Sequence, residues 1–163
     1  RCGTMTHDYK RHGTTTLYAA LRVLDGVVIG ECRRRHRSQE FVQFLRRLER
    51  VTPKRHHLHL ILDNLSAHKS PPVRRWLMRH PRVHFHFVPT SSSWLNLAER
   101  WFLEITRTRI RRGTFTSVPA LERAIREYLA HYNQQPQPFI WTKDADTILA
   151  KIDRCKEALN SAD

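Results

Sequence analysis

Two acidic residues stand where the sequence could support metal-dependent chemistry. Asp63 directly follows the apolar run 60–62, and Glu99 lies inside the segment 91–102. Two carboxylates that meet in a folded protein repel each other unless a cation lies between them, and Mg²⁺ is the hard ion that such oxygen ligands hold. Two such ions can activate a water or a 3′-hydroxyl and stabilise the leaving oxygen of a phosphodiester. The residue types therefore indicate phosphoryl transfer on nucleic acid.

A purely structural explanation of the same acids stays open at this point. Asp63 could cap a turn, and Glu99 could lie on a solvated helix face. Phe102 and Leu103 stand three and four positions after Glu99, so no arginine follows it at ion-pair spacing. Asn64 and His68 could orient Asp63 or contact phosphate, and they could equally cap the turn. Spacing alone does not decide between these explanations.

The elements around the acids would position them. Residues 58–62 form a near-continuous apolar run, typical of a strand buried on both faces, and Asp63 closes it. The carboxyl end of such a strand is where mixed and parallel sheets place their chemistry. Glu99 falls in a helix predicted from Ser93 to about Arg112, on the border between its apolar face and a basic face. That basic face is the arginine stripe, defined as Arg100, Arg107 and Arg111.

The rest of the chain predicts a scaffold of strands and helices. The Asp25-Gly26 pair indicates a two-residue turn joining strands 14–24 and 27–32 into an antiparallel hairpin. A helix follows Ser38, strands cover 58–62 and 83–87 with a helix between them, and further helices begin near Ser93, Ser117 and Thr142. An antiparallel pair followed by strands joined through helices predicts one mixed sheet with helices on its faces. The length of 163 residues fits a single domain.

Charge limits the class of partner. The chain has 29 Lys and Arg against 15 Asp and Glu, a formal net charge of +14. Arginine suits bidentate contacts to phosphate, so the expected partner is a polyanion, DNA or RNA. We expect the arginine stripe to contact the DNA backbone, since it lies near Glu99. With no membrane-length apolar run and no leader at its start, the chain is expected to be cytoplasmic and nucleoid-associated, with no membrane partner.

Cysteine and histidine give no clear metal motif. Cys2, Cys32 and Cys155 lie far apart, which argues against a disulfide framework and a zinc knuckle. Four histidines alternate along the two predicted strands. Because no cysteine or spaced ligand set accompanies them, half-exposed strand positions are favoured over zinc ligands. These histidines are His57, His59, His84 and His86.

Several motifs in order resemble a known family. These are LDNLSAHK at 62–69, PTSSSWLN at 89–96 and ERWF at 99–102, with RHGT at 11–14 and RIRRG at 109–113. Together they look like the DDE transposases of bacterial insertion sequences in the mariner-like superfamily, and the resemblance covers nearly the whole chain. It implies an α/β, RNase H-like fold, a mixed sheet flanked by helices. It also implies cutting and joining of DNA by three acids on two divalent ions, Mg²⁺ or Mn²⁺.

Carried over by resemblance, Asp63 matches the second acid and Glu99 the third, as catalytic residues and metal ligands. In the family the first acid lies on a strand ahead of the segment that residues 11–14 resemble. Neither Asp8 nor Asp25 is assigned to it, since Asp25 belongs to the hairpin turn. We therefore expect residues 1–163 to lack the first strand and to be inactive, or nearly so, on their own. The family's N-terminal helix-turn-helix region is expected to be absent as well.

The resemblance also implies supporting residues and partners. Asn64, His68 and Asn96 would support the acids. Trp94 and the arginine stripe would contact DNA, although Trp94 could equally anchor the start of its helix. The expected partners are double-stranded DNA, as transposon ends and target, and a second copy of the chain bound to that DNA.

Two other functions remain to be weighed. The first is a non-catalytic DNA-binding or assembly remnant of a transposase, which keeps the basic face without the chemistry. The second is an RNase H-like nuclease that acts on RNA hybrids, and it is less favoured because the SSSWLN segment at 91–96 resembles the transposase group.

Overall fold

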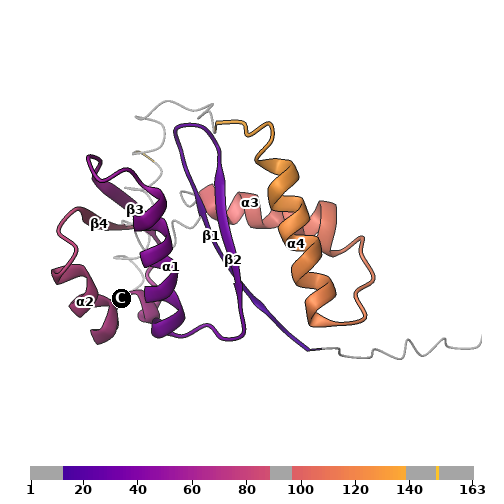
Figure 1. The fold of residues 1–163 in the computed structure, drawn as a ribbon, viewed down its shortest axis with the longest axis horizontal. Coiled ribbons are helices and arrows are strands. Elements are labelled where there is room, and N and C mark those ends of the chain that lie inside the picture. Colours follow the sequence, from indigo (N-terminus) through magenta and orange to yellow (C-terminus); the bar gives the residue numbers. More distant parts are fainter. Residues whose placement is uncertain (1–12, 89–96, 139–149, 151–163) are drawn as a thin grey trace, which may run out of the picture.

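A computed structural model describes residues 13–88, 97–138 and 150 (Figure 1). Strands and helices alternate as predicted through the last described helix. The predicted helix after Thr142 lies almost wholly outside the described residues. The elements in chain order are β1 (Thr16–Leu21), β2 (Val28–Arg33), α1 (Ser38–Val51), β3 (Leu58–Leu62), the 3₁₀ helix η1 (Ser66–Lys69), α2 (Pro71–Met78), β4 (Val83–Phe87), α3 (Leu97–Ile105), the π-helical turn η3 (Thr106–Ile110) and α4 (Val118–Tyr132).

The four described strands form two sheets, so the prediction of one mixed sheet is wrong for this part of the chain. β1 and β2 are antiparallel, whereas β3 and β4 are parallel, with Leu58 opposite Val83 and Leu62 opposite Phe87. The strand directions are therefore those that the sequence predicted. The two sheets are joined by side-chain packing on α1 rather than by backbone hydrogen bonds, which explains the division.

Helix α1 lies at the centre of the first core. Its apolar residues recur every three or four positions, so they share one buried face. That face packs against both sheets and against α2 at once. The buried members of this core are Tyr18, Phe41, Phe44, Leu45, Leu48, Val73, Trp76 and Val83.

A second core fills the opposite side of the β1–β2 hairpin, where α3 and α4 lie (Figure 1). Its buried members are Val28, Trp101, Ile105, Ile125 and Leu129. Gly30 lets α4 approach β2 closely, because a Cβ there would stand 2.6 Å from a methyl carbon of Leu129. The Asn133 amide binds the backbone of Val28, accepting from its N–H at 2.9 Å and donating to its carbonyl at 2.8 Å. The hairpin is thus held between α1 on one face and α3 and α4 on the other.

The connection between β1 and β2 is longer than the two-residue turn that was predicted. The strands end at Leu21 and begin again at Val28, and the Arg22 backbone bonds to both Gly26 and Val27 at 2.8 Å. Gly26 has a φ of 76°, and a Cβ there would lie 2.0 Å from the Gln137 carbonyl oxygen. Only glycine fits that position without strain.

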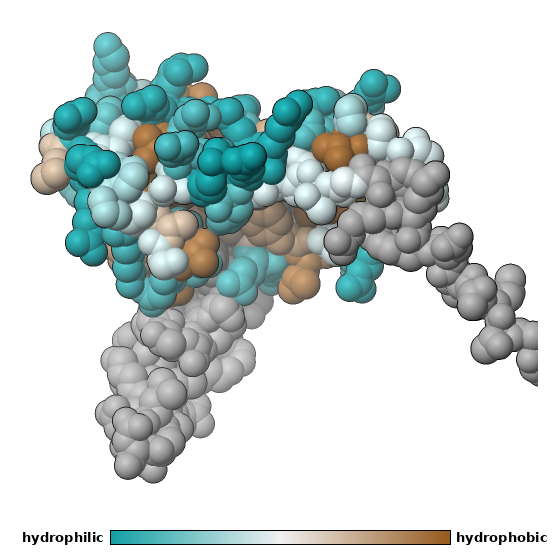
Figure 2. Space-filling model, turned by 90° about the horizontal axis from the view of Figure 1, so that it is seen from below, coloured by the Kyte–Doolittle hydropathy of each residue, from teal (hydrophilic) through white to brown (hydrophobic). Residues whose placement is uncertain are grey.

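The prediction that β3 is buried on both faces is also wrong. Leu58, Leu60 and Leu62 pack toward the first core, whereas Ile61 on the other face is 56% exposed. Viewed from below, most of the described surface is hydrophilic, and hydrophobic residues gather toward the middle of the molecule (Figure 2). None of the described helices has the length and apolar character needed to cross a membrane.

Candidate active site

Asp63 comes directly after β3, as predicted. Its Oδ1 accepts a hydrogen bond from the Leu65 N–H at 3.3 Å and lies 3.0 Å from His68 Nδ1. The Asp63 side chain is nevertheless 48% exposed, so solvent reaches the carboxylate. Because β3 and β4 are parallel, this acid stands at the edge where both strands end.

His68 holds Asp63 from the adjoining 3₁₀ helix. Its side chain is only 11% exposed, and its ring packs against Phe41 of α1 with the centroids 4.4 Å apart. Nδ1 also lies 3.4 Å from the Asp63 carbonyl oxygen. This geometry fits the interpretation that His68 orients Asp63.

Asn64, predicted as a supporting residue, connects the ends of two strands. Its amide donates to the Val88 carbonyl at 2.7 Å and so ties the end of β3 to the end of β4. Its Oδ1 accepts from Lys69 Nζ at 2.6 Å, and that ammonium also lies 4.7 Å from the centre of the Phe87 ring. Lys69 ends the motif at 62–69, but sequence reasoning gave it no role. The lysine brings a positive charge to the edge that carries Asp63.

Glu99 lies in the first turn of α3 and is exposed. Trp101 and Ile105 anchor that helix in the second core, at 3% and 0% exposure, while Leu103 beside Glu99 is 72% exposed. Glu99 is therefore exposed to solvent on an anchored helix, and the expectation that it faces an active site stays a prediction. Ser93, the predicted start of the helix, is outside the described residues.

The helix that carries Glu99 is not α-helical as far as Arg112. After Ile105 the backbone widens into the π-helical turn η3, where the Arg111 N–H donates to the Thr106 carbonyl at 2.9 Å. The end of this helix is fixed to α4 by an ion pair of 3.3 Å between Arg109 and Glu127. The widened turn changes the angular spacing of the arginine stripe, although all three of its members are exposed.

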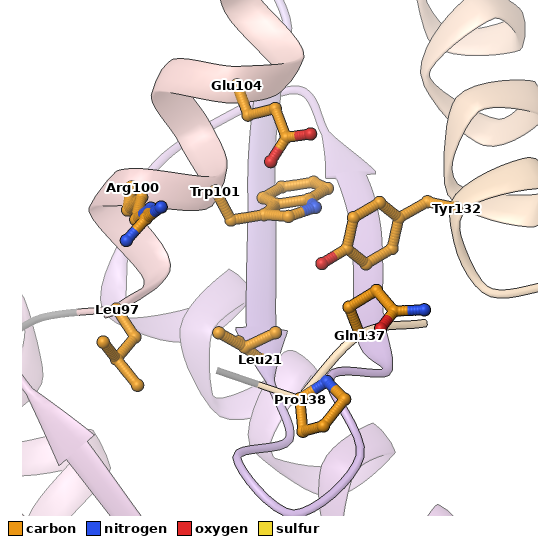
Figure 3. A pocket seen from close by; sticks show the side chains of 8 residues that line it. All are labelled: Leu21, Leu97, Arg100, Trp101, Glu104, Tyr132, Gln137 and Pro138. Carbon is orange, nitrogen blue, oxygen red and sulfur yellow. The ribbon is translucent and has the colours of Figure 1, made fainter. Parts of the chain in front are cut away.

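One member of the stripe, Arg100, lines a pocket of about 230 Å³ at the start of α3 (Figure 3). Trp101 and Tyr132 supply aromatic walls, and the Glu104 carboxylate lies over the indole in this view. Burial, together with the neighbouring Glu104 and Tyr128, raises the pKa of Tyr132. The phenol of Tyr132 therefore stays neutral at neutral pH beside the side chains of Arg100 and Glu104.

Only some of the predicted site residues lie next to one another in the structure. The structure brings Asn64 and His68 to Asp63, whereas Glu99 belongs to another element. Across the described ranges, no group of three or more His, Cys, Asp or Glu side chains is arranged to hold a metal ion. Trp94 and Asn96 lie outside those ranges. The carboxylates of Asp63 and Glu99 are both solvent-accessible, and their oxygens are the donors that Mg²⁺ or Mn²⁺ prefers, so the donor chemistry fits such an ion.

The strand histidines form a ladder on the exposed face of the β3–β4 sheet. His57 Nδ1 lies 2.9 Å from His84 Nε2, and His59 Nδ1 lies 2.9 Å from His86 Nε2. His59 also stacks on His84, with ring centroids 4.7 Å apart. Strand positions are confirmed for His59, His84 and His86, of which only His84 is half-exposed, whereas His57 directly precedes β3 and is exposed, as are His59 and His86. A hydrogen bond between two imidazoles needs one neutral ring to accept it.

The ladder should make stability depend on pH. Burial and then the neighbouring His59, His57 and His86 lower the pKa of His84 in the folded protein. The unfolded chain consequently binds more protons just below the ordinary histidine pKa of about 6.5. Stability should be complete above that pH and fall as the pH drops below it. Urea unfolding midpoints measured from pH 8 to pH 5 should decline less in His84→Gln than in the parent. An equally steep decline would exclude the ladder as its source.

Comparison with known proteins identifies the family of the chain. Residues 3–122, well over half of the chain, match the family model described as DDE superfamily endonuclease. The chain is also similar to a protein of Shigella sonnei named "Insertion element IS630 uncharacterized 39 kDa protein", with 28% identity over 102 residues. That match covers 63% of this chain and 29% of the relative, so the chain spans less than a third of the relative's length. The matched family segment includes β3, Asp63 and the whole of α3, and the chain belongs to the family of DDE superfamily endonucleases.

Proposed function

We propose that this chain is part of the catalytic domain of an insertion-sequence transposase, which cuts and joins DNA by metal-dependent phosphoryl transfer. The observation that carries the proposal is Asp63, held by His68 at the carboxyl end of β3 in a chain of the DDE endonuclease family. The relative from Shigella sonnei is named as an insertion-element protein, which supports transposition rather than another nuclease reaction.

In this proposal, Asp63 and Glu99 hold Mg²⁺ or Mn²⁺ through their carboxylate oxygens, as parts of a two-ion site. The bound ions would activate the attacking water or 3′-hydroxyl and stabilise the leaving oxygen. The protein's own task is to place the acids. His68, fixed against Phe41, would keep the Asp63 carboxylate at one orientation, and α3 would present Glu99 from a helix anchored by Trp101.

We propose an RNase H-like fold for the domain. The antiparallel hairpin followed by parallel strands joined through helices supports it. The substrate would be double-stranded DNA on the nucleoid, with a second copy of the chain in the complex. Exposed Arg107 and Arg111 on η3 and the following turn support contact with the DNA backbone.

The deciding experiment is calorimetric titration of Mn²⁺ into the chain and into the double variant Asp63→Asn, Glu99→Gln. Binding that the double variant loses would support one metal site made by both acids. Binding of equal strength in the two proteins would contradict it. Negligible binding in both would mean either that the first acid is indispensable for metal capture or that the chain is a non-catalytic DNA-binding remnant.

His68 provides a finer test of the same site. Replacing it by Ala should weaken Mn²⁺ binding by roughly 10–100-fold, the usual effect of losing a residue that orients a metal ligand. His68→Gln should recover part of that loss, because its amide can still donate to Asp63. Equal affinities for His68→Ala and the parent would show that the 3.0 Å contact with Asp63 has no role in metal binding.

A further inference from the structure

The helices α1 and α2 lie side by side and enclose a groove of about 400 Å³. Both helices are on the side of the hairpin away from α3 and α4, and therefore away from the arginine stripe (Figure 1). Trp76 forms part of the groove lining and is 5% exposed, with its ring stacked on His80 at a centroid distance of 4.0 Å. The groove thus has a rigid aromatic floor. Its polar lining includes Gln39, Gln43, Arg46, Arg75 and Arg79.

A second hollow of about 540 Å³ continues the groove past the end of α1. Arg46 lines both hollows, and Arg50 and Lys54 extend the basic lining toward Arg82. Arg82 is fixed in place, because its guanidinium donates to the carbonyl oxygens of Pro53 at 2.9 Å and His56 at 3.2 Å. The two hollows share Arg46 in their linings, and together we call them the basic groove.

The acids near the basic groove do not neutralise it. Glu49 is the acid in its lining, and it is already occupied by His80 at 2.6 Å and Arg82 at 3.2 Å. Five cationic side chains remain that form no ion pair with the acids of the described residues. These five are Arg46, Arg50, Lys54, Arg75 and Arg79.

The unpaired charges favour a polyanion as the occupant. Arg46 and Arg50 are one helical turn apart, as are Arg75 and Arg79, and like charges at that spacing repel each other. Some exposed arginines elsewhere pair with acids, such as Arg37 with Glu40, whereas Arg107 and Arg111 of the arginine stripe resemble the groove arginines in forming no ion pair with acids of the described residues. A row of uncompensated guanidinium groups along a channel is the arrangement that binds successive phosphates.

The course of the basic groove connects it with the proposed active site. Near the start of α1, Phe41 packs on His68, and η1 contacts both α1 and α2. Near the other end of α1, Arg82 binds the residues that follow the helix. A helix of 14 residues is about 21 Å long. The groove therefore follows α1, whose start packs on η1 near the edge that carries Asp63 and whose end lies near Arg82 at the opposite edge of the β3–β4 sheet.

From these observations we infer that the basic groove between α1 and α2 is a second nucleic-acid interface, which binds DNA backbone phosphates on the side of the molecule opposite the arginine stripe. This inference rests on the proposed function for the nature of the partner. It adds a path for DNA that neither Asp63 nor Glu99 touches. DNA bound there would extend beyond the point where it is cut.

The test is the salt dependence of binding to a fluorescently labelled duplex, measured by anisotropy in EDTA. Arg46→Gln, Arg75→Gln and Arg79→Gln together should reduce the slope of log K against log salt by about 0.9 for each DNA phosphate that the variant no longer neutralises. A matched triple variant, Arg34→Gln, Arg35→Gln and Arg123→Gln, removes the same charge from exposed positions outside the groove. Its slope should equal that of the parent. The single variant Arg75→Gln, whose slope should fall by about 0.9, serves if the triple variant unfolds.

Other outcomes would overturn the inference. An unchanged slope in the groove variant, or equal reductions in both triple variants, would mean that the groove makes no particular phosphate contacts. A change from dimer to monomer in sedimentation, with the DNA slope unchanged, would assign the groove to an acidic surface of a second copy. Because EDTA removes metal, these results do not depend on the Mn²⁺ titration.

Discussion

Replacing Asp63 by Asn should weaken Mn²⁺ binding by more than the roughly 10–100-fold that loss of an orienting residue causes. The substitution keeps the shape of the side chain and its contacts to Leu65 and His68, but it removes the negative charge that attracts the ion. Since Asp63 is half-exposed and follows the end of β3, the fold should not change. Calorimetric titration of the variant and the parent, at the same pH and salt, measures the effect.

A double-mutant cycle would reveal whether Glu99 serves the same ion. Residues that act on one ion show non-additive effects, so Asp63→Asn and Glu99→Gln together should cost less than the sum of the single changes. Glu104→Gln is the matched control, because it removes another exposed carboxylate from the same helix. That control should bind Mn²⁺ like the parent. Additive effects, or a weakening in Glu104→Gln as large as in Glu99→Gln, would mean that the acids attract cations only through general charge.

Strands and helices were predicted correctly where the spacing of apolar residues matches the residues that are buried. Phe41, Phe44, Leu45 and Leu48 recur at helical spacing, and they form the buried face of α1. The division into two sheets could not be predicted, because which strands pair depends on contacts between residues distant in the chain. The apolar composition of β3 also led to the wrong prediction that both of its faces are buried, because Ile61 lies on the exposed face that carries the histidines. A run of apolar letters does not say which face is covered.

The place of Asp63 in the fold was predictable from the sequence, whereas the packing that fixes its neighbour His68 was not. The position of Asp63 after an apolar strand gave its place at the end of β3. The contact between His68 and Phe41 joins two elements 27 positions apart in sequence, and nothing local indicates it. The π-helical turn after Ile105 could not be predicted either, because its residues have the same spacing of apolar positions as an ordinary α-helix. Propensity and periodicity describe neighbours along the chain, whereas these features arise from tertiary packing.

The largest effect on stability should come from Leu45→Ala. Leu45 is 0% exposed and belongs to the core in which α1 packs against both sheets. Truncating such a leucine typically costs about 2–5 kcal/mol, a large share of the roughly 5–15 kcal/mol that stabilises a typical domain. The urea midpoint should fall while the slope m keeps the value of the parent. Met78→Ala on α2, where the side chain is 77% exposed, should stay within about 0.5 kcal/mol of the parent.

The denaturant slope m of Leu45→Ala also reports whether the two sheets unfold together. The two described sheets share no backbone hydrogen bonds, so their unfolding is coupled through the side chains of α1. If that coupling survives the cavity, the variant should unfold in one transition that fluorescence and circular dichroism report alike. A reduced m, or separate transitions by the two probes, would mean that the β1–β2 hairpin with α3 and α4 unfolds independently of the β3–β4 sheet. Asp63 and Glu99 would then belong to separately folding units, and a shared metal ion would have to join them.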